Sequence, residues 1–444
     1  MSNIFGTHDQ NTLAQFRDIE SRAVASALMA DGHFGYVMPV GGVAAYDNQV
    51  SVVGVGFDIA CGNCAIKTNK TLADITNRNY TLEELQTNPY AVSQDKLLNQ
   101  LAIQISQHIS FGVGRVNKEA DAPTDNPLFH DVAWWAIPNV GGYRDTLLEK
   151  AREQLGTVGS GNHYVDVFVG DDGFIWVGVH FGSRGLGHTI ASNFLAIGQG
   201  GQWGDRGSER ETMLDLSTPS GQDYWSLMEL AGRYAYAGRE WVAQKVVELI
   251  GGEVVDMVHN HHNFAWKEMH LVGENNEEKE LVVVRKGATP AFPGQRGFVG
   301  GSMGDDAVIL RGAVCQIPTD EDFDEFDVQY GGRGGNSPLR QVNALFSTVH
   351  GAGRVMSRNE AAGKLNRRTG RRITRGKISP ADMQSWLQAK GVILRGGGLD
   401  EAPQAYRRLS DVLSAQGDTI EVLHTLRPLI VVMAGDTEFD PYKD

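Results

Sequence analysis

A stretch late in the chain places a histidine, two glycines and an arginine in an order that suits phosphate chemistry. An apolar run ends at Val349, His350 follows it, and residues 351–354 read Gly-Ala-Gly-Arg. Glycines let main-chain N–H groups approach a phosphate, and an arginine can donate to two phosphate oxygens at once. A histidine at such a turn can act as a nucleophile or carry a proton. A structural histidine beside a tight turn would give the same pattern, so these residues alone leave both possibilities open.

Residues of metal-ligand type recur at the ends of predicted strands. Asp58 and Cys61 are three residues apart, after a β-branched run and before a glycine. A carboxylate and a thiolate at this spacing can bind one cation, although a turn-capping aspartate and a buried cysteine would look the same. His163 and His180 each lie at the end of a short strand, among neighbours that favour hydrogen bonding over core packing. These histidines are therefore candidates for further ligands.

Two more segments carry similar chemistry. Residues 258–263 read Val-His-Asn-His-His-Asn after a predicted strand, so ligand and amide side chains follow one another there. Residues 300–306 form a glycine-rich loop before another predicted strand. Such a loop can hold a phosphate on its backbone N–H groups, but this one lacks the lysine of a P-loop and is a weak signal by itself.

Hydrophobic periodicity predicts the elements that would position these residues. The longest predicted helix covers residues 222–250, after a turn at 218–221 and before Gly251-Gly252, and residues 115–142 read as a long loop. The other predicted helices cover residues 11–30, 94–109, 144–155 and 379–391. Strands are expected at 52–57, within 159–167 and 175–188, at 254–255, 281–284, 307–310 and 429–433, and in the apolar run that stops at His350.

The composition limits the class of protein. The 444 residues would allow two or three domains, but the candidate residues spread from 31 to 354. We therefore expect one large α/β domain, mixed α+β, over residues 1–444, with loops that converge on a single metal-containing pocket. Cys61, Cys64 and Cys315 are an odd number, which favours reduced thiols. No apolar run reaches the roughly 18 residues that span a bilayer, so a soluble, cytoplasmic protein is expected.

The charge distribution argues against a broad nucleic-acid-binding face. The formal net charge is −14, and a protein that coats nucleic acid over a wide surface is usually basic. One local exception is the segment 367–377, which has six basic residues in eleven. This segment fits either a solvated loop or a local nucleic-acid contact.

In sequence order, these motifs resemble the RtcB family of RNA-splicing ligases over nearly the whole chain. The matching motifs are DGHFG at 31–35, GVGFDIACG at 54–62, GSGNH at 159–163, HFGSRGLGH at 180–188, HHN at 261–263, RKGA at 285–288, GSMG at 301–304, HGAGR at 350–354, and the segments 401–406 and 426–428. Eight or more motifs in one order make the resemblance highly specific.

The resemblance implies an enzyme that uses GTP and manganese to join an RNA 3′-phosphate or 2′,3′-cyclic phosphate to a 5′-hydroxyl end. It implies that His350 attacks the α-phosphate of GTP and carries GMP as a phosphoramidate. The implied ligands of a two-manganese site, in which Cys61 is placed to bridge, are Asp58, Cys61, His163, His180 and His262. These ligand types suit several divalent metals, and affinity alone would favour zinc, so manganese follows from the resemblance only.

The resemblance also implies a nucleotide site and phosphate contacts. The implied nucleotide-binding residues are Asn162, Asn263, Gly301, Ser302, Met303, Gly351, Ala352, Gly353 and Tyr406. The candidates for neutralising RNA phosphate or pyrophosphate are Arg184, Lys286 and Arg354.

The chain departs from the family pattern where the guanine base would be recognised. Met433 stands in place of a lysine, Ala307 in place of a serine, Asp166 in place of a glutamate and Gly300 in place of a proline. Metal and nucleophile chemistry look intact, whereas base recognition looks altered. Two alternatives are a manganese-dependent phosphoesterase or RNA-end-processing enzyme with altered nucleotide specificity, and a non-catalytic protein that binds RNA ends.

Overall fold

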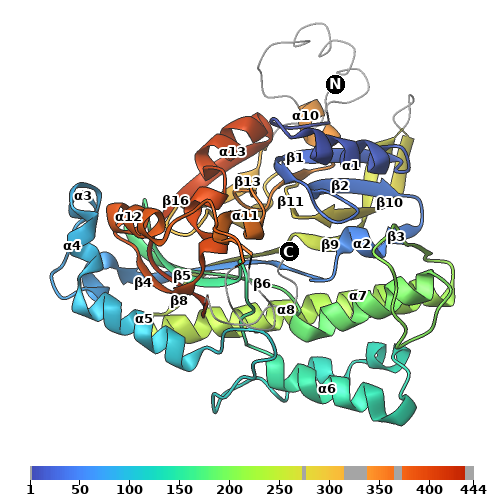
Figure 1. Ribbon diagram of the computed structural model, residues 1–444, viewed down its shortest axis with the longest axis horizontal. Coiled ribbons are helices and arrows are strands. Elements are labelled where there is room, and N and C mark those ends of the chain that lie inside the picture. Colours follow the sequence, from blue (N-terminus) through green and yellow to red (C-terminus); the bar gives the residue numbers. More distant parts are fainter. Residues whose placement is uncertain (1–2, 273–276, 315–337, 365–372, 436–444) are drawn as a thin grey trace, which may run out of the picture.

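The computed structural model describes residues 3–272, 277–314, 338–364 and 373–435, and it combines helices with two main β-sheets (Figure 1). Cys315 and the larger part of the basic segment 367–377 lie outside the described residues. The mixed α and β class predicted from the sequence is confirmed. No helix in the described ranges is long and apolar enough to cross a membrane.

The larger sheet has eight strands and carries most of the candidate ligands. Its strands, in spatial order, are β12 (Arg296–Val299), β13 (Ala307–Gly312), β16 (Ile420–Gly435), β5 (Tyr164–Gly170), β6 (Phe174–Phe181), β4 (Gly62–Thr71) and β8 (Val254–His261), with β15 (Ile393–Gly397) paired to β16. All pairs are antiparallel except that between β15 and β16. The late strand β16 therefore lies between strands formed much earlier in the chain.

The smaller sheet has four antiparallel strands in the order β1 (Ala25–His33), β2 (Val40–Tyr46), β10 (Glu277–Lys286) and β9 (Asn263–Val272). Two strand pairs accompany it, β11 (Ala288–Pro290) with β14 (Ser347–Val349) and β3 (Gln49–Ser51) with β7 (Met213–Asp215). Only His262 separates β8 of the larger sheet from β9 of the smaller one. The two sheets are thus joined directly through a candidate metal ligand.

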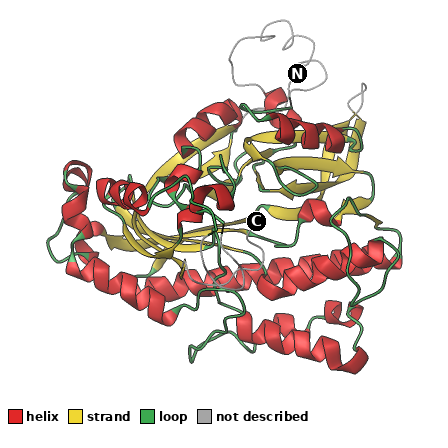
Figure 2. Cartoon of the chain, viewed as in Figure 1, coloured by secondary structure: helices red, strands yellow, loops and turns green. Residues whose placement is uncertain are grey.

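Helices cover the sheets, and the longest lies along one side of the molecule (Figure 2). The described α-helices are α1 (Gln10–Glu20), α2 (Val52–Val55), α3 (Leu82–Thr87), α4 (Pro89–Ser93), α5 (Lys96–His108), α6 (Tyr143–Gln154), α7 (Arg184–Gly198), α8 (Pro219–Ile250), α10 (Pro338–Asn343), α11 (Arg358–Ala362), α12 (Pro380–Lys390) and α13 (Leu409–Gln416). Helix α8 begins with the Thr218 side chain accepting from the N–H of Gly221 and ends at Gly251, whose φ is 70°. Gly251 ends the helix as predicted, whereas the helix begins at Pro219, before the predicted start at residue 222, because Thr218 caps it.

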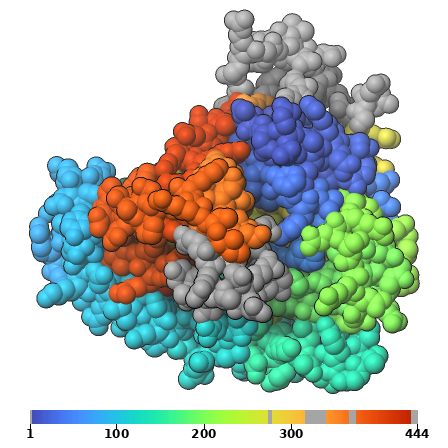
Figure 3. Space-filling view, viewed as in Figure 1, coloured from blue at the N-terminus to red at the C-terminus, as the bar shows by residue number. Residues whose placement is uncertain are grey.

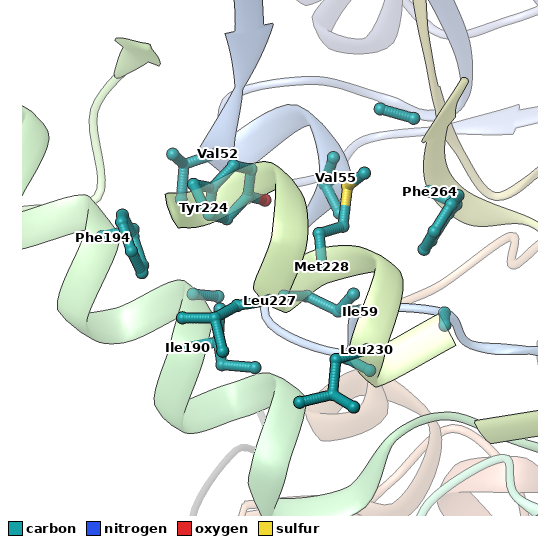
Figure 4. Close-up of a cluster of buried hydrophobic side chains, with 14 of the residues drawn as sticks. Val52, Val55, Ile59, Ile190, Phe194, Tyr224, Leu227, Met228, Leu230 and Phe264 are labelled. Atoms are coloured by element: carbon teal, nitrogen blue, oxygen red, sulfur yellow. The ribbon is translucent and has the colours of Figure 1, made fainter. Parts of the chain in front are cut away.

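A buried apolar cluster fixes α8 against α7 and α2. Leu227 and Met228 of α8 lie beside Ile190 of α7 and Val55 of α2 (Figure 4). Burying a side chain of this size contributes roughly 1.5 to 3 kcal/mol. Because Asp58 follows α2 closely, this packing also fixes the start of the candidate metal site.

Most predicted helices are confirmed, but two predictions near the start of the chain are wrong. The helix predicted over residues 11–30 ends at Glu20, and residues 25–33 form β1. That segment is buried between neighbouring elements and pairs with β2, and this tertiary pairing overrides its helical spacing. The strand predicted over 52–57 is the short helix α2, because the Ser51 hydroxyl accepts from the N–H of Gly54.

Segments from opposite ends of the described chain lie side by side. The surface coloured blue, from the first strands, meets the orange-red surface that includes α13 (Figure 3). The side chain of Gln416 accepts from the N–H of Ala30 at 3.2 Å, and Arg407 donates to the Ala30 carbonyl at 2.7 Å. These contacts tie β1 to the segment that follows the candidate nucleophile.

Candidate metal and nucleophile site

The five candidate metal ligands come from four places in the chain and meet where the two sheets join. Asp58 and Cys61 lie in the turn before β4, and His163 lies one residue before β5. His180 is next to the last residue of β6, and His262 lies between β8 and β9. The fold therefore brings together residues that are far apart in sequence, as the family resemblance implied.

The ligand atoms form two groups that share one thiol. Asp58, Cys61 and His163 form one group, Cys61, His180 and His262 form the other, and the ligand atoms of each group lie within 4.8 Å of one another. The Cys61 sulfur is 3.6 Å from Nε2 of His163 and 3.7 Å from Nε2 of His180. The Asp58 carboxylate is 3.1 Å from Nε2 of His163. Because Cys61 belongs to both groups, one sulfur atom lies within reach of both.

The donor set fits divalent transition metals. Cys61, His180 and His262 are at most 5% exposed, and imidazole, thiolate and carboxylate are the ligands that such cations take in proteins. Nδ1 of His262 and Nδ1 of His163 are buried without a hydrogen-bond partner. A third group, Asp171, Asp172 and His424, is more exposed, and the Lys67 ammonium already lies 2.6 Å from Asp172. The two groups that share Cys61 are therefore the better candidates for a metal site.

Electrostatics prepare the histidines to act as ligands. Burial, reinforced by the neighbouring histidines, lowers the pKa of His180 and of His262 well below the ordinary value. Neutral imidazole is the form that binds a metal. Burial raises the pKa of Asp58, but the hydrogen bond and charge of His163 outweigh this, so that its pKa is lowered. Burial and the Asp58 carboxylate raise the pKa of the Cys61 thiol, and a coordinating cation favours the thiolate.

A neighbouring amide sets the orientation of one ligand. Nδ1 of His180 lies 2.7 Å from Oδ1 of Asn63, its direct cross-strand neighbour on β4. The Asn63 amide nitrogen donates to the carbonyl of Phe298, which fixes the amide oxygen towards the imidazole. His180 therefore donates from Nδ1 and presents Nε2 to the site, an arrangement typical of metal-binding histidines.

His350 lies beside the metal ligands, at the end of β14. Its ring is 4.9 Å from the ring of His262, measured between centroids. Nδ1 of His350 lies 2.6 Å from Oδ2 of the fully buried Asp31, which also accepts from the backbone N–H groups of His350 and Gly351 at 3.0 and 3.3 Å. The contact with Asp31 leaves Nε2 as the nitrogen that can react. Burial raises the pKa of the Asp31 carboxyl, but the charge and hydrogen bonds of His350 outweigh this effect, so the pKa is lowered.

Asp31 contacts both the ring and the backbone of His350, and its sequence motif does not reveal this contact. Its place on β1, far from His350 in sequence, gave no local signal of the contact. The available signal was an aspartate inside a run of small and apolar residues, since a buried carboxylate needs a partner.

The other predicted residues surround the same site, in different ways. The Asn263 side chain accepts from the N–H of Gly287 at 2.8 Å and donates to the Asp58 carbonyl at 3.4 Å. Lys286 is 7% exposed and donates to the Val53 carbonyl, and burial lowers its pKa to about 8. Asn162 is exposed beside His163. Asn263 thus holds backbone around the ligands, whereas Asn162 faces the surface.

The predicted arginines and Tyr406 have protein partners. Arg354 donates to Glu401, to the Tyr406 hydroxyl and to the Asp400 carbonyl. The Tyr406 hydroxyl also donates to Glu401. Arg184 donates to Gly112 and Thr157 near His163.

The turn after His350 packs against Asp31. The Gly351 N–H donates to Asp31, Ala352 is buried, and Gly353 has a φ of 72° and lies against the Asp31 backbone. These contacts hold the His350 turn in place.

The glycine-rich loop and the altered base-recognition residues meet near His180. Met303 and Met433 share a buried apolar cluster, and Met433 pairs across strands with Tyr164, whose ring stacks on His180. A Cβ at Gly300 would lie 2.1 Å from the Tyr164 hydroxyl, so glycine there leaves room for that hydroxyl. Gly301 precedes Ser302 in the same loop.

Polar atoms in this region are buried without partners. The Tyr164 hydroxyl, Ser302 Oγ and Asp166 Oδ1 make no hydrogen bond, and burial raises the pKa of Asp166 well above its usual range. Unpaired buried polar atoms are costly, so a ligand that pairs with them is expected here. Ala307 packs instead in a separate core cluster that includes Trp176 and Phe298.

Comparisons with known proteins show which family the chain belongs to. A family model described as tRNA-splicing ligase RtcB matches residues 12–319 and 334–434. The chain is 30% identical to the tRNA-splicing ligase RtcB of Archaeoglobus fulgidus, over 91% of this chain and 87% of that protein. It is 28% identical to the tRNA-splicing ligase RtcB of Thermococcus kodakarensis and 27% identical to the RNA-splicing ligase RtcB of Escherichia coli K12, over 91% of this chain and 86% and 89% of those proteins. The chain belongs to the RtcB family of tRNA-splicing ligases, which are RNA-ligase enzymes.

Proposed function

We propose that this protein is a GTP-dependent RNA ligase that joins a 3′-phosphate or 2′,3′-cyclic phosphate end to a 5′-hydroxyl end at a two-manganese site. The observation that carries the proposal is the placement of His350 next to His262, with Nδ1 held by Asp31. A histidine oriented in this way beside two metal-ligand groups suits transfer of a nucleotide through the histidine. Homologous proteins named as tRNA-splicing ligases support the RNA substrate.

In the first step, Nε2 of His350 attacks the α-phosphorus of GTP. A P–N bond forms, the bond to the bridging oxygen of pyrophosphate breaks, and pyrophosphate leaves. Asp31 favours the tautomer with the proton on Nδ1, so that Nε2 keeps its lone pair for attack. The charge that develops on Nδ1–H during attack is stabilised by the nearby carboxylate, in the way that an aspartate supports a catalytic histidine.

The metals, held by Asp58, Cys61, His163, His180 and His262, would supply Lewis acidity to the phosphate oxygens and activate water for opening a cyclic phosphate. Lys286, close to the Asn263 turn, is a candidate for neutralising phosphate charge, as is Arg184 near His163. Asn162, Asn263, Gly301, Ser302, Met303 and the turn 351–353 are proposed to surround the nucleotide.

Two further transfers complete the proposed reaction. An oxygen of the RNA 3′-phosphate attacks the phosphorus of the GMP group, and the P–N bond to His350 breaks. The 5′-hydroxyl then attacks the 3′-phosphate phosphorus, a phosphodiester forms, and GMP leaves. A cyclic phosphate is a diester and must first be hydrolysed to the 3′-phosphate, because the transfer of GMP described here requires a terminal phosphate monoester.

The direct test is to incubate the protein with α-labelled GTP and manganese. A ligase of this kind retains a protein-bound label that acid removes and alkali does not, because a phosphoramidate is labile to acid. Omitting manganese should abolish the label. A protein that carries no label from any nucleotide, yet releases phosphate from RNA ends, would instead support the phosphoesterase.

Replacing Asp31 with asparagine is expected to slow transfer of GMP to the protein by about ten- to a hundredfold, the equivalent of losing one hydrogen bond to a charged group. Asparagine can still accept from the N–H groups of His350 and Gly351 but carries no charge to support the imidazole. The measurement is the single-turnover labelling rate, with bound metal determined in parallel. A wild-type rate in Asp31→Asn would show that the carboxylate has no part in the step.

Replacement of the family lysine by Met433 is expected to weaken discrimination between GTP and other nucleotides. Losing a charged hydrogen bond to the base lowers selectivity by about ten- to a hundredfold, while the methionine sulfur can still pack on a purine face. Labelling should be compared with GTP, ATP, CTP and UTP at equal concentration. A preference for GTP above roughly a thousandfold would contradict the relaxed pocket, and Met433→Lys should sharpen the preference.

A further inference from the structure

A buried arginine lies behind the proposed metal site without a carboxylate partner of its own. Arg239, on α8, is 0% exposed, and all its hydrogen bonds in the described structure go to neutral acceptors. Burying a guanidinium is costly unless its donors are satisfied. Its placement therefore calls for an explanation beyond core packing.

The terminal nitrogens of the guanidinium contact two backbone carbonyls and one side chain, each of a residue next to a candidate metal ligand. One terminal nitrogen donates to the Ala60 carbonyl at 2.9 Å, just before Cys61, and to the Phe181 carbonyl at 2.6 Å, just after His180. The other terminal nitrogen donates to Nδ1 of His261 at 2.9 Å, just before His262.

The contacts also define the state of two histidines. Nε of Arg239 donates to Nε2 of His259 at 2.9 Å. Arginine has no acceptor atom, so Nε2 of His259 and Nδ1 of His261 must be the unprotonated nitrogens of neutral rings. Tyr236, one turn earlier on α8, stacks on His261 with ring centroids 3.9 Å apart. The side of the guanidinium that faces β8 is thereby held in one arrangement.

A glycine makes room for this cluster. Gly62 is paired with Phe181 on one side and with His261 on the other. A Cβ at this position would lie 2.2 Å from the Asn260 carbonyl oxygen and 3.1 Å from a terminal nitrogen of Arg239. The close approach of β4, β6 and β8 and the fit of the guanidinium therefore depend on the same residue.

We propose that Arg239 is a positioning residue of the metal centre: its guanidinium fixes the relative placement of the backbone segments that carry Cys61, His180 and His262. The inference rests on the metal site of the proposed function. Lysine cannot replace the guanidinium, because its donors radiate from one nitrogen, whereas arginine presents five N–H groups in a rigid plane. Nε and both terminal nitrogens of Arg239 each donate at least one of these hydrogen bonds.

The test uses Co2+ alone, without nucleotide or RNA, titrated into the metal-free protein. Thiolate-to-cobalt and d–d absorption report the ligand set and its geometry. Arg239→Lys is expected to weaken Co2+ binding by about ten- to a hundredfold, the effect typical of partners that orient metal ligands, and to alter the d–d spectrum. In a separate assay of RNA end joining, excess Mn2+ should restore part of the rate that Arg239→Lys loses. Wild-type affinity together with a wild-type spectrum would overturn the proposal.

A matched control separates positioning from stability. Val246 is seven residues further along α8, fully buried, and in a core cluster that contains none of the candidate ligands. Val246→Ala should lower the unfolding temperature and leave Co2+ affinity and spectrum unchanged. If Val246→Ala weakens Co2+ binding as strongly as Arg239→Lys, loss of helix packing explains both and the specific role is refuted.

A second pair of variants keeps the test open if Arg239→Lys does not fold. His261→Asn keeps an acceptor close to the position of Nδ1, whereas His261→Leu removes it. The asparagine variant should bind Co2+ more tightly than the leucine variant, and equal affinities would contradict the proposal. If the wild-type protein binds no Co2+, the metal centre of the proposed function is refuted. If the wild-type protein binds Co2+ and the Arg239 variant binds it equally well, only the positioning role of Arg239 is refuted.

Discussion

Replacing His350 with alanine is expected to reduce the GMP label to background, a loss on the order of 10⁴- to 10⁶-fold, as for other enzymes deprived of their covalent nucleophile. The methyl group has no lone pair to attack phosphorus, so end joining should fall with the label. Bound metal should be retained, because His350 is in neither of the ligand groups that share Cys61. The measurements are protein labelling from GTP, joining of RNA ends and metal content of the same preparation.

The matched control is His108→Ala. His108 ends α5, pairs with Glu119 on the surface and has a side chain that is 42% exposed. This variant should take up label at the wild-type rate. A labelled His350→Ala protein would show that another residue carries the nucleotide and would remove the central step of the proposed reaction.

Replacing Cys61 with alanine is expected to lower manganese affinity by roughly a hundredfold or more, beyond the ten- to hundredfold loss typical of outer partners. The thiol belongs to both ligand groups, so its loss weakens both. Activity should fall in parallel with metal occupancy. Titration of Mn2+ against bound metal and labelling rate checks whether the two losses share one midpoint.

Cys64 offers a close control for this change. It is also a buried free cysteine, three residues further on, but it packs in an apolar cluster and burial raises its pKa to about 12. Cys64→Ala should lower stability slightly and leave metal affinity intact. Full manganese occupancy and full activity in Cys61→Ala would assign Cys61 to the core as well.

The sequence predicted well the elements whose ends carry strong local signals. Helix α8 has Thr218 and Pro219 at its start and Gly251 at its end, and α12 has Ser379 and Gly391 in the equivalent places. These residues satisfy or terminate helical hydrogen bonds by themselves, so no tertiary information is needed. Residues 25–33 lack such signals, and only pairing with β2 decides that they form a strand.

The candidate site divides in the same way. Cys61, His163 and His262 could be identified because each stands in a distinctive motif. Asp31 and Arg239 could not be given roles, because their importance depends on contacts with residues that are distant in sequence. A buried aspartate in a strand and a buried arginine in a helix look ordinary until the fold places them against the proposed nucleophile and the turn that carries candidate metal ligands.

The central position of β16 has a consequence for the order in which the protein can fold during synthesis. β5 and β13 each hydrogen-bond to β16, which the ribosome produces long after β5. Until residues 420–435 emerge, one edge of each of these strands remains unpaired, and exposed edges of this kind invite association with other chains. Contacts between such distant segments also slow folding. Cells that make this protein should therefore depend on chaperones that hold the nascent chain, and a stalled chain that ends before residue 420 should aggregate rather than retain a partial sheet.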